Sequence, residues 1–104
     1  MTRTLSKKLA NVKPGTLFIG IDLGLDRNVA VVITERAKRL DKFSFPHDYL
    51  GYAFFRRRLN KLHEVHQASE LWVGMEPSNY YWKLLSAELE RHQMPYRLVN
   101  SYTV

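Results

Sequence analysis

Short apolar runs alternate with polar links in the first half of the chain, and they predict three β-strands. Residues 16–23 form a nearly continuous apolar run that carries Asp22 near its end, as expected of a strand buried on both faces. Residues 28–34 are rich in β-branched side chains, and residues 39–45 alternate in polarity as a strand near a sheet edge does. Because the links between these segments are short, we predict an antiparallel meander.

A segment with helical spacing follows the third strand. Pro46 ends that strand, and Asp48 has the side chain and the position of a helix N-cap, with the helix running to about residue 67. Apolar positions recur three and four residues apart in it, which predicts one buried face. The predicted stripe consists of Phe55, Leu59, Leu62 and His66, with Leu50, Phe54 and Val65 beside it.

The last third of the chain predicts a strand, a helix and a strand. Residues 71–76 are a short apolar run that ends in Glu76, and residues 96–100 form another extended segment. Ser78 is placed to cap the helix between them, and Pro95 stops it. Its predicted buried stripe contains Trp82, Leu85 and Leu89.

The predicted element order, βββαβαβ, defines an α/β fold. Strands that follow helices return through right-handed crossovers, so the fourth and fifth strands should run parallel to the first. We therefore expect a mixed five-stranded sheet of order 3-2-1-4-5, with helices covering its faces. This is the arrangement of the RNase H-like (RuvC-like) core.

The composition fits one small domain. The chain has 104 residues, which we divide into a basic arm at residues 1–15 and a domain at residues 16–104. It has no cysteine, which excludes disulfides, thiolate zinc sites and a cysteine nucleophile. We see no signal peptide and no apolar run long enough to cross a membrane, so we expect a soluble cytoplasmic protein without a membrane partner.

The net charge of +6 and the pI of about 9.8 indicate a polyanionic partner such as nucleic acid. The candidate contacts are Arg56, Arg57, Arg58 and Lys61 on the first helix and Lys7 and Lys8 in the arm. Each group also has an alternative interpretation. The basic residues of the helix are then a solvated helix face, and those of the arm belong to a disordered tail. His63 and His66 are better explained as part of the basic helix face than as metal ligands.

Asp22 and Glu76 are the candidate catalytic residues. Both lie at the carboxyl ends of strands that the predicted order makes parallel neighbours, which is where open α/β sheets bind ligands. Two carboxylates side by side make a hard-oxygen site for Mg²⁺ or Mn²⁺, although two acids are too few to hold the two metals that phosphodiester cleavage commonly uses. In the alternative interpretation Asp22 caps a turn, while Glu76 caps the next helix or pairs with a surface arginine.

Two sequence motifs carry a resemblance to a known family. The segment G-I-D-L-G-L-D-R-N (20–28) resembles the first acidic motif of the DEDD transposases of insertion-sequence-110 elements, and G-M-E-P-S-N-Y-Y-W (74–82) resembles the second. The segment Leu98-Val99-Asn100 is similar to the stretch that follows in that family. The chain departs from the pattern at Asn79, where glycine is frequent, and at Gly24-Leu25, where Ser-Lys is frequent.

The resemblance implies an RNase H-like catalytic domain whose acids follow the order Asp, Glu, Asp, Asp. Asp22 would be the first and Glu76 the second, and the last two have no counterpart here, so the chain looks truncated after the fifth strand and inactive alone. The implied full-length enzyme is a transposase of a bacterial or archaeal nucleoid that cleaves and recombines DNA with Mg²⁺ or Mn²⁺. Its implied partners are element ends or a branched DNA junction, a guide RNA and a second copy of itself.

Two alternatives come from other functional classes. The segment G-I-D-L-G also opens the ATP-binding domain of the actin and sugar-kinase superfamily, but the turn after it, L-D-R-N, lacks the hydroxyl and glycine residues that cradle phosphates there. Asp26 in this turn is better explained as a turn former than as a further ligand. The other alternative is a non-catalytic module for DNA binding or dimerisation.

Overall fold

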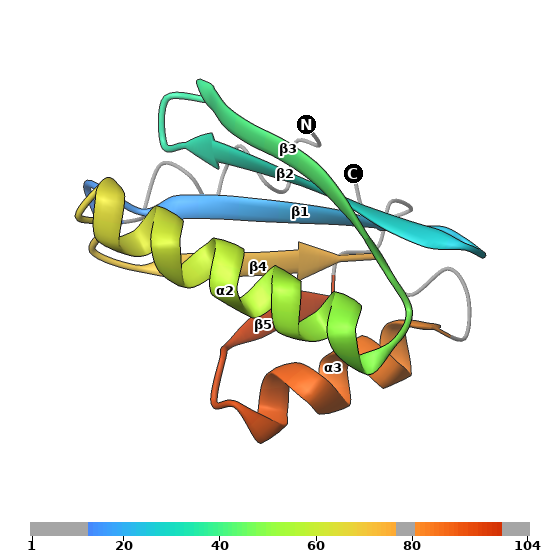
Figure 1. Cartoon of the computed structure of the whole chain (residues 1–104). Coiled ribbons are helices and arrows are strands. Elements are labelled where there is room, and N and C mark those ends of the chain that lie inside the picture. Colours follow the sequence, from blue (N-terminus) through green and yellow to red (C-terminus); the bar gives the residue numbers. More distant parts are fainter. Residues whose placement is uncertain (1–12, 77–80, 99–104) are drawn as a thin grey trace.

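The sheet has the predicted strand order. In the computed structural model, which describes residues 13–76 and 81–98, β1 (Leu17–Leu23), β2 (Arg27–Thr34) and β3 (Arg39–Pro46) form an antiparallel meander (Figure 1). The chain continues through α2 (Tyr49–Val65), β4 (Leu71–Met75), α3 (Tyr81–Arg91) and β5 (Tyr96–Leu98). β4 pairs with β1 and β5 with β4, both in parallel, so the sheet has the order β3-β2-β1-β4-β5. The predicted mixed five-stranded, RNase H-like α/β fold is confirmed.

The boundaries of the elements agree with the prediction to within about two residues wherever both can be compared. Three predicted features lie outside the described residues, namely the arm up to residue 12, the Ser78 cap and residues 99–100 of the fifth strand.

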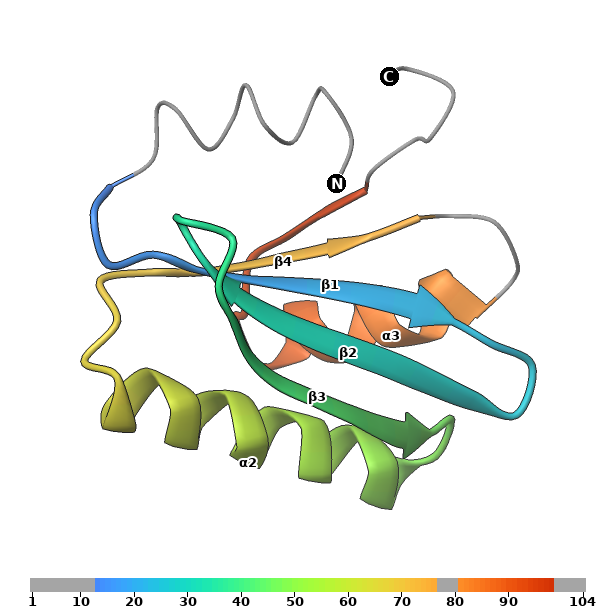
Figure 2. The same ribbon diagram turned by 90° about the horizontal axis from the view of Figure 1, so that it is seen from above.

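The two helices in the described part of the chain pack on the same face of the sheet, whereas we had expected helices to cover its faces (Figure 2). The reason is the direction of the connections. From β3 through α2 to β4, and from β4 through α3 to β5, the chain moves toward the same edge, and two right-handed crossovers in one direction place their helices on one side.

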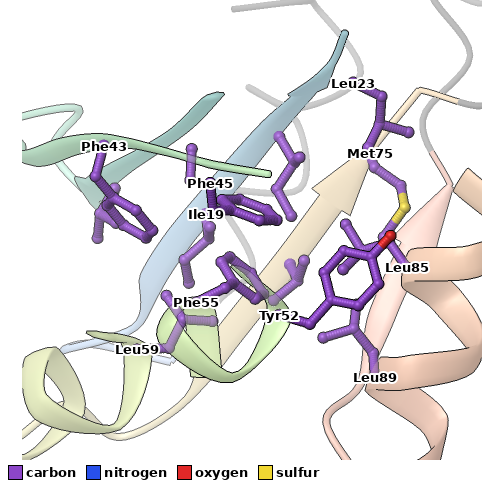
Figure 3. Close-up of a cluster of buried hydrophobic side chains, with 14 of the residues drawn as sticks. Ile19, Leu23, Phe43, Phe45, Tyr52, Phe55, Leu59, Met75, Leu85 and Leu89 are labelled. Atoms are coloured by element: carbon purple, nitrogen blue, oxygen red, sulfur yellow. The ribbon is translucent and has the colours of Figure 1, made fainter. Parts of the chain in front are cut away.

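A single hydrophobic core fills the space between the sheet and these helices (Figure 3). Alternate positions of β1 point into it, so the odd-numbered residues are buried while Gly20 and Asp22 are exposed on the other face. Phe45 stacks on Phe55 with a centroid distance of 4.6 Å, which joins β3 to α2. The core members of β1 and the helices are Leu17, Ile19, Ile21, Leu23, Tyr52, Phe55, Leu59, Leu85 and Leu89.

The buried side of α2 differs from the predicted stripe. Asp48 caps the helix as predicted, and its carboxylate accepts a hydrogen bond of 2.7 Å from the amide of Gly51. Gly51 lies so close to Pro46 that a Cβ there would collide with the carbonyl oxygen and ring of that proline. This contact fixes the rotation of the helix and turns Tyr52 inward. Consequently three residues that we assigned to the stripe or its border are exposed: Leu50, Val65 and His66.

An ion pair ties α2 to the edge strand β3. Arg58 donates from Nε and Nη2 to the two carboxylate oxygens of Asp41, at 2.8 and 2.9 Å, and its guanidinium lies 4.9 Å from the centre of the Phe43 ring. These hydrogen bonds from Arg58 hold the pKa of the Asp41 carboxyl below its ordinary value of 3.8. The carboxylate is thus favoured in the folded state, so its contribution to stability is present above about pH 3.8 and is lost as the pH falls through the lower folded pKa.

We predict that Asp41→Asn lowers the free energy of unfolding at pH 7 by at most about 1 kcal/mol, because the Arg58 side chain is 38 % exposed and solvent screens the pair. The difference between the two proteins should shrink as the pH is lowered below 3.8. Urea unfolding measured at both ends of this range tests the expectation. Glu64→Gln, which neutralises an exposed carboxylate on α2, is the control; a difference for Asp41→Asn that persists in full at pH 2 would contradict us.

Candidate active site

Asp22, near the end of β1, and Glu76, just after β4, lie at the carboxyl ends of two neighbouring parallel strands. Ile21 of β1 pairs with Met75 of β4, and each acid is the next residue along its chain. Both preceding side chains are buried against the helices, so the alternation of a strand directs both acids to the opposite face, where both are exposed. Adjacent strands are about 4.8 Å apart, and carboxylates one strand apart on the same face are close enough to share a cation.

This opposite face carries a groove that begins at the two acids. We call this face of the sheet, opposite the helices, the open face. Its apolar side chains are those of Phe18, Val29, Val31, Ile33 and Trp72. The groove has a volume of about 710 Å³ and is lined by Asp22 and Glu76 together with these apolar residues. Gly20 and Gly74, which pair with each other, form its floor.

Two basic residues also line the groove. Lys42 and Arg97 occupy one row across the sheet, in the order Lys42, Val31, Gly20, Gly74 and Arg97. The guanidinium of Arg97 lies 5.1 Å from the centre of the Trp72 ring, which positions it along the groove wall. Neither residue was among the sequence candidates. The signal that identifies them is strand parity, because each stands on the same side of the sheet as the acids.

The turn after β1 is held by a side-chain contact that the sequence analysis missed. The ring of His47, just after β3, lies 2.6 Å from the carbonyl oxygen of Gly24 through Nε2 and 3.2 Å from the amide nitrogen of Asn28 through Nδ1. With the amide of Asn28 donating, His47 carries its proton on Nε2 and donates it to Gly24. Asn28 is fully buried in β2. A polar residue within this otherwise apolar strand is the feature of the sequence that could have indicated a buried hydrogen-bond partner. The contact fixes the backbone two residues beyond Asp22.

The two acids do not gather further ligands from the residues that the structure describes. Within these residues no three His, Asp or Glu side chains come together in a way that could hold a metal ion. Asp26 is exposed in the β1–β2 turn. His63 is exposed on α2, and His66 is exposed at the position that follows the helix.

The basic run on α2 is divided between structural and exposed positions. Arg56 donates to Glu88 of α3 at 2.6 Å, and the same buried carboxylate accepts from Arg91 at 2.9 Å and lies 3.2 Å from His92. Together with the Arg58–Asp41 pair, this leaves Arg57 and Lys61 as the exposed members of the group. Lys7 and Lys8 lie outside the described residues.

The strand order defines the class of fold, an RNase H-like domain, and two acids lie at the carboxyl ends of its neighbouring parallel strands. Residues 19–104, most of the chain, match the sequence model of the DEDD transposase family of insertion-sequence-110 elements, described as a transposase. The chain belongs to this family. A search of curated proteins finds no match to it. No helix in the described part of the chain is long and apolar enough to span a membrane.

Proposed function

We propose that Asp22 and Glu76 bind a divalent cation, Mg²⁺ or Mn²⁺, and form half of the centre with which this transposase cleaves DNA strands. The observation that carries the proposal is the pairing of Ile21 with Met75, which brings the two acids side by side on one face. The two side chains fit a cation of this kind, because both are carboxylates, which are the ligands that hard cations prefer. A bound cation of this kind lowers the pKa of a coordinated water and stabilises charge on a phosphodiester oxygen.

The other residues of the groove have separate roles in this proposal. Lys42 and Arg97 attract the phosphate backbone of the substrate toward the acids. The hydrogen bonds of His47 and Asn28 keep the turn that follows Asp22 in one conformation, which holds this carboxylate in place. Two further aspartates, which the family resemblance requires and for which this sequence has no counterpart, would complete the ligand set. We therefore infer that the 104-residue chain binds metal without cleaving DNA.

The ATP-binding alternative is weaker than the transposase on two grounds. The chain belongs to a transposase family. In addition, the amide of Gly24 donates 3.1 Å to the carbonyl oxygen of Arg27, so that this backbone donor is already used within the turn. A phosphate cradle depends on free backbone amides at this place.

We predict that Mn²⁺ raises the melting temperature of the chain by roughly 5 °C at about ten times its dissociation constant. Asp22→Asn and Glu76→Gln should each abolish most of this shift, because each removes one of two ligands. Asp26→Asn, which neutralises an exposed acid four residues from Asp22, should leave it unchanged. Differential scanning fluorimetry across a Mn²⁺ titration makes the comparison. Equal shifts in the wild type and in Asp22→Asn would show that the metal binds elsewhere.

We also propose that the exposed side of α2 contacts DNA through Arg57 and Lys61. They are four residues apart on a helix, so their side chains lie on one side of it. Arg56 and Arg58 of the same run are held in ion pairs with acids of α3 and β3 and are less available to phosphate. A guide RNA and a second copy remain inferences from the family resemblance.

Replacing Arg57 and Lys61 together by alanine should weaken binding to a branched DNA duplex at low salt. It should also lower the slope of log K against log salt concentration by about 1 to 2, since up to two phosphate contacts disappear. Fluorescence anisotropy between 50 and 200 mM salt, roughly the range over which such contacts are lost, gives both quantities. Arg36→Ala with Lys38→Ala removes equal charge from the exposed β2–β3 hairpin and is the matched control. An equal loss in both double variants would mean that net charge, not this surface, governs binding.

A further inference from the structure

The turn between β1 and β2 carries an exposed leucine at the end of the sheet where the two acids lie. Leu25 is the middle residue of this turn, which joins Leu23 of β1 to Arg27 of β2, and it is 76 % exposed. The hairpin projects beyond the ends of β3 and β4 at this end of the sheet (Figure 2). The leucine lies outside the hydrophobic core of the described residues, so packing within the fold does not explain it.

The turn is held in one conformation by contacts on both sides. The amide of Gly24 donates to the carbonyl oxygen of Arg27 at 3.1 Å, and a Cβ at Gly24 would collide with that oxygen. The ring of His47 lies 2.6 Å from the carbonyl oxygen of Gly24, and Arg27 donates to the hydroxyl of Ser44 on β3 at 3.1 Å. Leu25 is therefore mounted on a rigid support, which a side chain that enters a stack of bases requires.

The chemistry of the turn suits DNA bases better than phosphate or another protein. Asp26 and Arg27, the two residues after the leucine, have opposite charges, so together they do not attract phosphate. One leucine also offers far less apolar area than a protein interface, which buries about 800 Å² on each partner. It has the size of the single apolar side chains that some DNA-binding proteins insert between neighbouring bases.

The leucine lies a short distance from the proposed cation site. Leu25 follows Asp22 by three residues, so their Cα atoms are at most about 11 Å apart. Successive phosphates of one DNA strand are spaced by about 3.4 Å along the helix axis. A strand whose phosphate is bound at the acids therefore passes the leucine within about three base steps.

We propose that Leu25 is a wedge that enters the base stack of branched DNA beside the strand held at Asp22 and Glu76. This role rests on the proposed function, because the acids define where the strand passes. Burying one leucine recovers about as much free energy as unstacking one base step costs. Insertion is therefore favourable where stacking is already interrupted, as it is at a branch point. The wedge thus makes the site favour branched DNA over a continuous duplex.

The test places a fluorescent adenine analogue, whose emission rises when it leaves the base stack, at the branch point of a four-way DNA junction. Saturating wild-type chain in Mg²⁺ should raise the emission roughly twofold or more, whereas an analogue in an arm far from the branch should not respond. Leu25→Ala should lose most of this rise at full occupancy, which fluorescence anisotropy verifies. Leu25→Met, which keeps the bulk of the side chain, should retain it.

Leu50→Ala is the matched control, because it removes an equally exposed leucine from the first turn of α2. It should behave as the wild type. A full rise with Leu25→Ala, an equal loss in both alanine variants, or no binding of the junction by the wild type would overturn the proposal. A wild-type dimer that Leu25→Ala converts to a monomer, as measured by light scattering, would assign the leucine to a protein interface and overturn it as well.

The cation site and the wedge fail in different measurements. Leu25→Ala should keep the Mn²⁺-dependent rise in melting temperature, because an exposed leucine is no metal ligand. Loss of that rise in the wild type would contradict the role of the two acids. An emission that does not change when the wild type saturates the junction would contradict the wedge alone.

Discussion

The parallel pairing of β1 with β4 is the interaction on which the rest of the structure depends. It sets Gly20 beside Gly74 and Ile21 beside Met75, and it thereby brings Asp22 next to Glu76 from 54 positions away in sequence (76 − 22). The pairing requires the crossover from β3 to β4 through α2. The rotation of this helix is fixed by the Asp48 cap and by the close contact of Gly51 with Pro46. A shift of this register by one residue would send one acid into the core and the other to solvent.

The two faces of the sheet have different roles because both crossovers proceed toward the same edge. One face receives α2 and α3 and becomes the core, and an ion pair between Arg56 of α2 and the buried Glu88 of α3 joins the two helices. The other face carries the two acids and the groove, which has Gly20 and Gly74 as its floor and is also lined by Lys42 and Arg97. Part of the positive charge of the chain is therefore structural, since Arg56 and Arg58 neutralise acids of the fold. Each of these pairs adds nothing to the net charge of +6, so the excess positive charge that can attract nucleic acid is carried by the other basic residues.

Most of the fold could be predicted from sequence because its signals are local. The apolar run before Asp22, the β-branched segment at residues 28–34 and the Asp48 cap each define an element without reference to the others. The rotation of α2 could not be predicted from the sequence, because it follows from a contact between Gly51 and Pro46 that only the folded chain makes. The handedness of the two crossovers was sufficient to predict that both helices lie on one face, although we had expected helices on both faces. The acid pair was predicted from strand order, whereas the contact of His47 with Asn28 depends on three-dimensional proximity across β2 and β3.

The central claim, that Asp22 and Glu76 share a cation, is tested most directly by locating Mn²⁺ in solution. A paramagnetic ion broadens the NMR signals of the amides near it, so substoichiometric Mn²⁺ maps its own position without relying on catalysis or on a change in stability. The account predicts that broadening centres on residues 20–24 and 73–76 and disappears in a chain with both Asp22→Asn and Glu76→Gln. Broadening that centres on another acidic position, such as Glu64 on α2 or Asp48 at its cap, or that survives in the double variant, would contradict it.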